Sequence, residues 1–282
     1  MVTTFQLTPD GMMREMARHA TMREASAELP DGAYTTFRTY MRRRVLRFNQ
    51  HLRRLEETLM LRRMPVQPIN DRTARMALGR IIAMLNYPES RFRLTYVPDG
   101  LFISIEPFAP YAQSLYDNGV WCATVSLHRN NPHAKSTTFI ASAADAYAAL
   151  PDGTHEGLML AEDGAVLEGL SSNFFAVVET RSHRDVPHGA SLHTEDQRVL
   201  IGVTRSLVLE VAQDVVPVVL EAVRYDDLSN VRECFITSVS REIMPVVKID
   251  ETVIGNGTPG PVTQELMHRF RELVTREAEE LV

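Results

Sequence analysis

The sequence is poor in cysteine and lysine and contains no long apolar run. Only Cys122 and Cys234 occur in 282 residues, which excludes a disulfide-dense scaffold and suits a reducing compartment. No apolar stretch approaches the roughly 20 residues that a membrane-spanning helix needs. The first residues, MVTTFQLTPDG, lack the basic start and the apolar segment of a signal peptide. We therefore expect a cytoplasmic protein.

The charge balance limits the partners. The formal net charge is −6 at pH 7, so a general nucleic-acid-binding surface is not expected. Hydrophobic residues make up 44% of the chain, which is enough to bury a substantial core in two domains or in one large one. We expect neither a nucleic acid nor a membrane as a partner.

Lysine is almost absent from the basic residues. Of the 30 lysine and arginine residues, only Lys135 and Lys248 are lysine. A guanidinium stays protonated and delocalised, so arginine cannot form a Schiff base, whereas a lysine amine can. Each remaining lysine is therefore a candidate for chemistry that arginine could not perform.

Apolar periodicity predicts helices and strands that mix without strict alternation, which indicates an α+β fold. Residues 11–29 give no clear pattern. A β-hairpin is expected over 33–48, Asn49 is a candidate N-cap of the helix that follows it, and Asn70 and Asp71 are expected to start a second helix. The expected helices cover 49–62, 71–85, 136–150, the segment after Gly202, and 262–280. The expected strands cover 91–97, 101–107, 120–127, 165–167, 174–178, 215–223, 233–238 and 245–250.

A proline-containing stretch, PFAPYAQSLYDNG over 107–119, has the composition of a linker. We therefore expect a smaller N-terminal domain over 1–110, a linker over 111–118 and a larger C-terminal domain over 119–282. A polar excursion over 180–198 carries His183, His188 and His193. Their spacing matches neither face of a helix or strand, so we interpret this segment as a solvated loop and expect no metal site.

Several segments combine residue types that could bind an anionic cofactor. In GAVLEGLSSNFFAVVE (164–179), Glu168 stands where one strand ends, before a longer polar connection than a tight hairpin would need. In GVTR (202–205), a glycine turn and Thr204 as N-cap would open a helix whose first N–H groups suit a phosphate. In TSVSREIMPV (237–246), hydroxyls crowd a strand end and could form a second anion cradle. Taken singly, each segment has an ordinary alternative: a polar turn or a capped helix.

The combination is more specific than its parts. A lysine for covalent chemistry, a carboxylate at a strand end and two anion cradles are the groups that pyridoxal phosphate requires. The lysine would hold the aldehyde as an imine, the carboxylate would keep the pyridine nitrogen protonated, and the cradles would neutralise the phosphate.

These segments resemble the fold-type IV pyridoxal-phosphate enzymes, which include branched-chain aminotransferases, D-amino-acid aminotransferases and 4-amino-4-deoxychorismate lyases. EGLSSNFF is similar to the family's E-G-x-x-S/E-N-hydrophobic-F signature, and HAKSTTFIAS is similar to its catalytic-lysine segment. Four further blocks follow the family's order, so that the resemblance covers about residues 30 to 270: DGAYTTFRTY, HLRRLEET, IGVTRSLVLEVA and FITSVSREIMPVVKID.

The resemblance implies a two-domain D-amino-acid-aminotransferase-like fold with the cofactor between the domains, and a homodimer. It implies that Lys135 is the Schiff-base lysine and also the base that moves a proton during transamination, and that Glu168 is the partner of the pyridine nitrogen. Lys248 then remains an exposed strand-end residue. The residues implied to hold the phosphate are Arg54, the backbone of Val203 and Thr204, and the segment of Ser238 and Val239.

Alternate residues of a strand share a face, so the resemblance also implies two substrate-facing rows. The row residues are Tyr34, Thr36 and Arg38 in one segment and Arg91 and Arg93 in the other. A planar guanidinium matches a carboxylate bidentately, and we expect Arg93 to meet the substrate carboxylate. The alternative is that Arg91 or Arg38 pairs with a structural acid such as Glu89.

The sequence departs from its relatives at three points. Val239 stands where many members carry a hydroxyl residue, and Phe139 stands where branched-chain enzymes have a tyrosine. The R-x-H pair of D-amino-acid enzymes is not evident after RFRLTYVPDG. The expected activity is transamination between an amino acid of the branched-chain or D-amino-acid class and a 2-oxo acid. The alternatives are 4-amino-4-deoxychorismate lyase activity, which gives p-aminobenzoate and pyruvate, and a binding protein that kept the fold without the activity.

Overall fold

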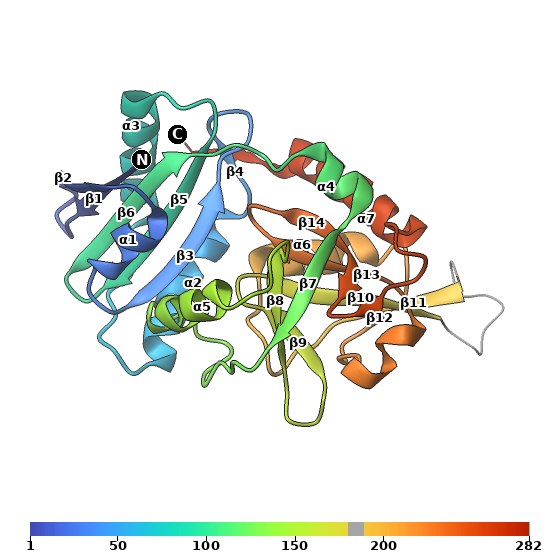
Figure 1. The fold of residues 1–282 in the computed structure, drawn as a ribbon. Helices are drawn as coiled ribbons and strands as arrows, with labels where there is room; N and C mark the ends of the chain where they lie inside the picture. Colours follow the sequence, from blue (N-terminus) through green and yellow to red (C-terminus); the bar gives the residue numbers. More distant parts are fainter. Residues whose placement is uncertain (180–188, 282) are drawn as a thin grey trace. The chain divides into compact units, whose positions relative to one another are not determined.

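The computed structural model describes residues 1–179 and 189–281, and these divide into two compact units (Figure 1). Unit 1 comprises Met1–Pro110, Ala134–Ala141 and Val274–Val282, and unit 2 comprises Tyr111–His133 and Ser142–Leu273. The sequence led us to expect continuous domains, whereas residues 134–141 and 274–282 group with unit 1. The expected linker groups with unit 2 and contains α4 (Gln113–Asn118).

Backbone hydrogen bonds explain why these two segments group with unit 1. The Tyr34 N–H donates to the Lys135 carbonyl over 2.9 Å, and Ala33 forms an antiparallel bridge with Ser136. Strand β16 (Glu279–Glu280) pairs with β4 (Arg44–Val45). Pairing between residues so far apart in the sequence leaves no trace in local periodicity.

The sheet of unit 1 runs in the order β2-β1-β6-β5-β3, and its neighbouring strands are antiparallel. Its strands are β1 (Val2–Leu7), β2 (Met13–His19), β3 (Ala33–Arg38), β5 (Ser90–Val97) and β6 (Gly100–Pro107). Helices α2 (Phe48–Leu61) and α3 (Asp71–Leu85) bury their apolar stripes against one face of this sheet. Phe37 lies between Phe48 and Phe92 there, with the Phe37 and Phe92 ring centroids 5.2 Å apart.

Of the hairpin expected over 33–48, only an isolated antiparallel bridge between Tyr40 and Arg44 forms, because β3 pairs with β5 and β4 pairs with β16. Met41 and Arg42 adopt positive φ values of 47° and 73° in the segment that follows β3. Residues 11–29, which gave no clear pattern, contain the whole of β2 and the short helix α1 (Met22–Ala27). Helix α1 packs in a separate apolar cluster with Val2.

Helices α2 and α3 begin in different ways. The expected start of a helix at Asn70 and Asp71 is confirmed, because α3 begins at Asp71 and the Asn70 side chain caps it by accepting the Thr73 N–H over 2.9 Å. The prediction of Asn49 as the N-cap of α2 is wrong, because α2 already begins at Phe48. Its N-cap residue, Arg47, is left-handed with φ 51°, and Glu279 accepts the Phe48 N–H over 3.1 Å instead.

The sheet of unit 2 runs β12-β11-β10-β13-β14-β7-β8-β9 among the described residues, and β9 also pairs with β10. Its strands are β7 (Val120–Val125), β8 (Glu156–Leu160), β9 (Val166–Gly169), β10 (Asn173–Glu179), β11 (Ala190–His193), β12 (Val218–Val219), β13 (Val231–Ser238), β14 (Glu242–Ile249) and β15 (Thr252–Val253), which pairs with β14. The helices are α5 (Thr138–Ala148), which begins in unit 1, α6 (Val203–Ala212), a 3-10 helix (Tyr225–Asn230), and α7 (Pro261–Glu277), which ends in unit 1.

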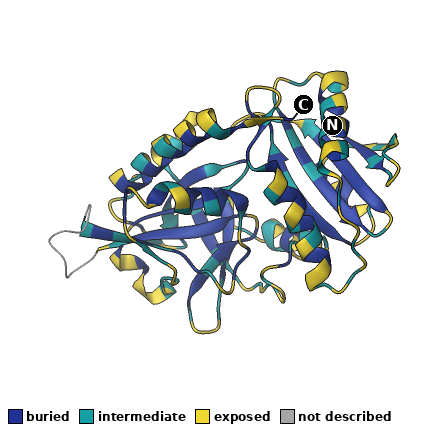
Figure 2. Ribbon diagram, turned by 180° about the vertical axis from the view of Figure 1, so that it is seen from behind, coloured by how far each residue is buried: buried dark blue, intermediate teal, exposed yellow. Residues whose placement is uncertain are grey.

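Burial follows this arrangement. Figure 2 shows that the strands are mostly buried, whereas the helices carry exposed residues along their outer sides. Phe175 and Phe235 stack in the core of unit 2, with ring centroids 4.9 Å apart. Within the part of the chain that the structure describes, no helix combines the length and the apolarity that crossing a bilayer requires.

Candidate active site

Glu168 lies on β9 and is one of the most deeply buried carboxylates of unit 2, with a side chain only 3% exposed. Its Oε1 accepts the Arg129 Nε–H over 3.0 Å. Its Oε2 accepts the Leu200 N–H over 3.1 Å and the Asn173 side-chain amide over 3.3 Å. A cation and two N–H donors stabilise the ionised carboxylate, so this strand end holds a fixed negative charge.

Asn173 connects Glu168 to the start of α6. Its side-chain nitrogen donates to the Leu200 carbonyl over 2.7 Å, and Asn173 lies opposite Glu168 in the β9–β10 ladder. A Cβ on Gly202 would stand 2.2 Å from the Asn173 Oδ1, so only glycine permits this close approach. The carboxylate and the helix N-terminus are therefore held together through one amide side chain.

Helix α6 begins without a side-chain cap. Its N-cap residue is Gly202, so the prediction of Thr204 as N-cap is wrong, and Thr204 lies inside the first turn. The Ser206 N–H donates to the Gly202 carbonyl, and the N–H groups of Val203, Thr204 and Arg205 precede the first intrahelical bond. Such a helix end carries a partial positive charge, and its first N–H groups can donate hydrogen bonds to an anion.

The second predicted cradle lies where β13 ends. The Ser238 Oγ accepts the Arg241 N–H over 3.3 Å, and Val239 begins the turn that leads into β14. Thr237 lies opposite Asn173 in the β10–β13 ladder, so Glu168, Asn173 and Thr237 share one face of the sheet. The Thr237 hydroxyl is buried, and it has no hydrogen-bond partner among the described residues. The two segments predicted to bind phosphate, at 203–204 and 238–239, thus flank one row of polar side chains.

Lys135 belongs to unit 1, where its backbone is held from two sides. Its carbonyl accepts the Tyr34 N–H from the edge strand β3, and its N–H donates to the Thr58 Oγ1 of α2 over 3.1 Å. The Lys135 Nζ lies 4.8 Å from the centroid of the Tyr34 ring. The lysine therefore extends along the face of the sheet that carries Tyr34, and an aromatic ring supports its amine.

A polar stripe of α2 faces the same region. His51, Arg54 and Thr58 recur at helical spacing, and the His51 Nδ1 lies 2.8 Å from the Thr35 Oγ1 of β3. Burial lowers the pKa of His51 well below its usual value, and the cations Arg54 and Lys135 lower it further. Burial likewise lowers the pKa of Arg54 to about 10. Burial therefore makes the positive charge of Arg54 costly.

The predicted substrate residues share one face of the unit 1 sheet. The β3–β5 register pairs Thr36 with Arg93 and Arg38 with Arg91, and Tyr34 follows the same alternation. Arg91 forms an ion pair with Glu106 rather than with Glu89. The Arg38 guanidinium lies over the rings of Tyr40 and Phe108.

Arg93 differs from its neighbours in its partners. Its Nη1 donates to the Ser26 Oγ of α1 over 2.6 Å and to the Met22 carbonyl over 3.4 Å, and its Nε donates to the Thr36 Oγ1 over 3.4 Å. None of these partners is a carboxylate. Burial lowers the pKa of Arg93, while the nearby Tyr34 acts in the opposite sense.

The structure thus groups the predicted residues in two sets. Lys135, Arg54 and the five substrate residues belong to unit 1, and Glu168 with the two cradles belongs to unit 2. Sequence reasoning missed Arg129, Asn173, His51 and Thr58. Asn173 is the last residue of EGLSSN and His51 is the first residue of HLRRL, so both stood in segments that already carried a signal.

The other candidates have ordinary partners. Lys248 lies within β14, with its Nζ 3.2 Å from Glu251 and 4.6 Å from the centroid of the Trp121 ring. His193 lies in β11 beside Ser191, whereas His183 and His188 fall outside the described residues. Within residues 1–179 and 189–281, no cluster of three or more His, Cys, Asp or Glu side chains is arranged to hold a metal ion.

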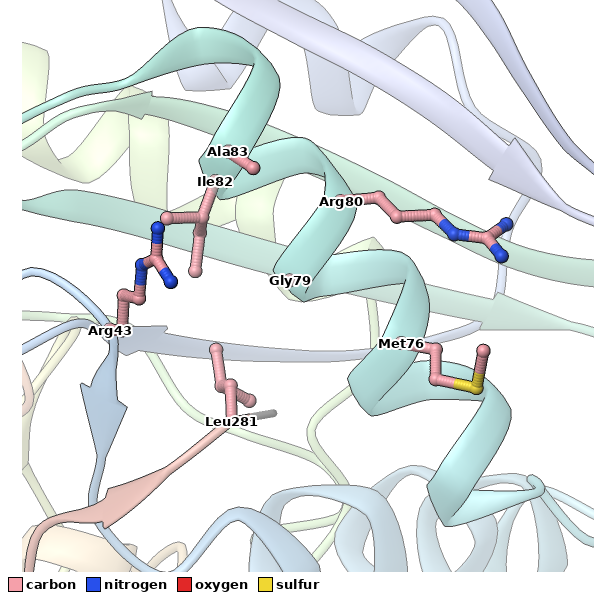
Figure 3. Close-up of a pocket in the computed structure, with 7 residues that line it drawn as sticks. All are labelled: Arg43, Met76, Gly79, Arg80, Ile82, Ala83 and Leu281. Atoms are coloured by element: carbon pink, nitrogen blue, oxygen red, sulfur yellow. The ribbon is translucent and has the colours of Figure 1, made fainter.

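A hollow of about 260 Å³ on α3 contains none of the predicted residues. Figure 3 shows Arg43 and Leu281 facing the side of α3 that carries Ile82, while the Arg80 side chain points away from them. Its lining is mostly apolar, and it offers no nucleophile or carboxylate. We do not assign the chemistry of the protein to it.

Comparisons with known proteins identify the family and the fold of the chain. The family model described as amino-transferase class IV matches residues 32–249. A D-alanine aminotransferase of Bacillus licheniformis is 32% identical over 125 residues, which are 44% of this chain and 41% of that protein. A Methanocaldococcus jannaschii protein named as a branched-chain-amino-acid aminotransferase is 31% identical over 175 residues, which are 59% of this chain and 57% of that protein. The matched part spans about half the length of these relatives.

Two solved structures share the fold. The T.th. branched-chain amino acid aminotransferase with pyridoxamine 5'-phosphate superposes with a TM-score of 0.79 at 21% identity, over 98% of this chain and 94% of that one. The branched-chain amino acid aminotransferase of Escherichia coli gives a TM-score of 0.74 at 21% identity, over 98% and 96%. At such identities the likeness establishes the α+β fold.

The depressed pKa of His51 predicts how stability depends on pH. The folded chain keeps His51 neutral, whereas the unfolded chain binds a proton there below about pH 6.5, so acidification through that value favours unfolding. Between pH 7.5 and 5.5, the free energy of unfolding should therefore fall by about 1 kcal/mol more in the wild type than in His51→Gln. Urea unfolding at both pH values measures this difference. His268→Gln, which removes an exposed histidine, is the control. If the free energy of unfolding changed with pH in the same way in the wild type and in His51→Gln, His51 would bind a proton as readily in the folded chain as in the unfolded one, which contradicts the prediction.

Proposed function

Because the chain belongs to the class IV aminotransferase family, we propose that it is a pyridoxal-phosphate-dependent transaminase. It moves an amino group between an amino acid of the branched-chain or D-amino-acid class and a 2-oxo acid. The names of the two relatives support both substrate classes. The single observation that carries the proposal is the buried Glu168 carboxylate, held by Arg129 and joined through Asn173 to a helix N-terminus without a side-chain cap.

The donor set of the chain fits pyridoxal phosphate. The bound cofactor supplies a conjugated ring that takes up the electron pair released at the substrate's α-carbon. Glu168, ionised and buried, suits a protonated pyridine nitrogen. The start of α6 and the buried Thr237 hydroxyl, which lacks a partner among the described residues, suit an anionic group close to that carboxylate.

Lys135 provides the amine in this proposal. Its amine would bind the cofactor's aldehyde carbon, and it would move a proton from the substrate's α-carbon to the cofactor's C4′. Its backbone is fixed by β3 and α2, and the Tyr34 ring lies beside its Nζ. This fixation orients the amine, so that the same group can serve both steps.

The phosphate is held by Arg54, by the backbone N–H groups of Val203 and Thr204, and by the segment of Ser238 and Val239. The lowered pKa of Arg54 supports its part, because a phosphate beside it would stabilise the charged guanidinium. Val239 has no hydroxyl, so it contributes its N–H alone. Thr204, buried in the first turn of α6, adds a hydroxyl to that end.

The substrate binds on the face that carries Tyr34, Thr36 and Arg93. Arg93 is the carboxylate-binding residue, since its present partners are two hydroxyls and one carbonyl. Arg91 is already paired with Glu106 and contributes less. We expect the enzyme to act as a homodimer in the cytoplasm.

An assay with an amino donor and 2-oxoglutarate tests the activity. A transaminase releases glutamate, and only when the acceptor is present. The lyase alternative would form pyruvate from 4-amino-4-deoxychorismate without any acceptor. Pyruvate without acceptor, or no turnover together with no cofactor absorbance, would overturn the proposal.

The two lysines of the chain provide an internal control for the assignment of Lys135. Borohydride reduction of the loaded enzyme should fix the pyridoxyl group on the peptide that contains Lys135. The peptide that contains Lys248 should stay unlabelled, because Lys248 is paired with Glu251 and lies over Trp121. Peptide mass spectrometry measures both, and label on Lys248 alone contradicts the assignment.

Arg93→Ala should weaken the binding of amino acids. The KM should rise by about ten- to a hundredfold, since hydrogen bonds to charged groups contribute about 1.5–3 kcal/mol. Amines that lack a carboxylate should be affected much less. The matched control is Arg91→Ala, from the same face of β5, which should change KM little. Equal losses for amines and amino acids in Arg93→Ala would mean that Arg93 supports the fold through α1.

A further inference from the structure

Glu156 is a fully buried carboxylate that the proposed chemistry does not use. It is the first residue of β8 and is 0% exposed. Its Oε1 accepts the Tyr147 hydroxyl over 2.5 Å and the Gly157 N–H over 3.1 Å. Its Oε2 accepts the hydroxyls of Ser171 and Ser172 over 3.0 and 2.9 Å. Both serines belong to the connection that follows Glu168.

Arg241 is the cationic partner of this carboxylate. Its Nη1 lies 3.2 Å from the Glu156 Oε2 and donates to the Ser171 Oγ over 2.9 Å. Its Nη2 donates to the His155 carbonyl over 3.3 Å. Burial lowers the pKa of Arg241, but Glu156 and the nearby Tyr147 and Tyr111 together outweigh burial, so that the net pKa is raised. Arg241 therefore keeps its positive charge beside Glu156.

The same pair touches two of the three segments of unit 2 that bear predicted cofactor residues, those of Glu168 and of Ser238. The Arg241 N–H donates to the Ser238 Oγ, so the side chain that meets Glu156 starts from the turn of the second cradle. A Cβ on Gly169 would stand 2.2 Å from the Ser172 Oγ and 2.7 Å from the Glu156 Cγ, so the connection after Glu168 packs directly onto Glu156. One ion pair thus fixes the chain just after Glu168 and just after Ser238.

We infer that Glu156 and Arg241 are positioning residues of the cofactor site: their ion pair sets the distance between the Glu168 carboxylate and the Ser238–Val239 backbone. The inference rests on the proposed function, in which the first group meets the pyridine nitrogen and the second meets the phosphate. Both groups must fit one rigid cofactor, so a shift in either segment weakens binding. A buried ion pair adds little net stability, because the cost of removing both charges from water offsets their attraction. A role in fixing geometry therefore explains this pair better than a role in stability.

The test compares two buried carboxylates of unit 2. Glu156→Gln removes the negative charge of the ion pair and nearly keeps the shape of the side chain. Glu233→Gln is the matched control, because Glu233 is also buried. Its carboxylate accepts the N–H groups of Val262 and Thr263 at the start of α7, which belongs to neither of the two cofactor segments. The dissociation constant for pyridoxal phosphate, its bound absorption maximum, and the melting temperature without cofactor are measured for both variants and the wild type.

We expect the dissociation constant to rise by about tenfold in Glu156→Gln, the scale on which residues that orient a binding group act, with a shifted absorption maximum. Glu233→Gln should lower the melting temperature but leave the dissociation constant within about twofold of the wild type. Equal dissociation constants for Glu156→Gln and Glu233→Gln would reduce Glu156 to a structural role and overturn the inference.

A second variant covers the case in which Glu156→Gln does not fold. Arg241→Lys keeps the charge but cannot reach Ser171, Glu156 and the His155 carbonyl together, so cofactor affinity should fall while the ion pair keeps the chain folded. An unchanged affinity in Arg241→Lys contradicts the inference. A wild type that does not bind pyridoxal phosphate would overturn the proposed function, and the role of the pair with it.

Discussion

The burial of the Glu168 carboxylate is the constraint on which the rest of unit 2 depends. An ionised group that is 3% exposed is costly unless cations and N–H donors surround it, and Arg129, Asn173 and the Leu200 N–H supply them. Those donors come from the loop before Lys135, from β10, and from the segment before α6. Gly202 and Gly169 are glycines because side chains there would collide with Asn173 and with Ser172. The fold gives up conformational freedom to keep one negative charge in place.

Unit 1 brings several basic side chains into one region. Lys135 and Arg93 lie over the Tyr34 ring, and burial lowers the pKa of Arg54 and of Arg93. Burial also lowers the pKa of His51 there. Charged groups of this sign attract anionic ligands, and a phosphorylated cofactor and a substrate carboxylate are both anions.

Local signals in the sequence were sufficient where the structure is local. Helix α3 starts after Asn70 as predicted, the strands at 91–97 and 101–107 form the β5–β6 pair, and class IV family membership agrees with the resemblance of EGLSSNFF and HAKSTTFIAS. The hairpin over 33–48 is reduced to one bridge between Tyr40 and Arg44, because β3 takes its partner from β5, which periodicity cannot reveal. Arg129 was missed because one arginine among so many in a polar loop carries no local mark of its distant partner. The roles of the predicted site residues remain predictions.

The pairing of Glu168 with the pyridine nitrogen is the central claim, and the protonation state of that nitrogen tests it most directly. The ¹⁵N chemical shift of ring-labelled pyridoxal phosphate can be measured in the wild type and in Glu168→Gln, both with the cofactor bound. The account predicts a protonated nitrogen in the wild type and an unprotonated one in the variant, because the glutamine keeps the shape of the side chain but not its charge. The same chemical shift in both proteins would contradict it.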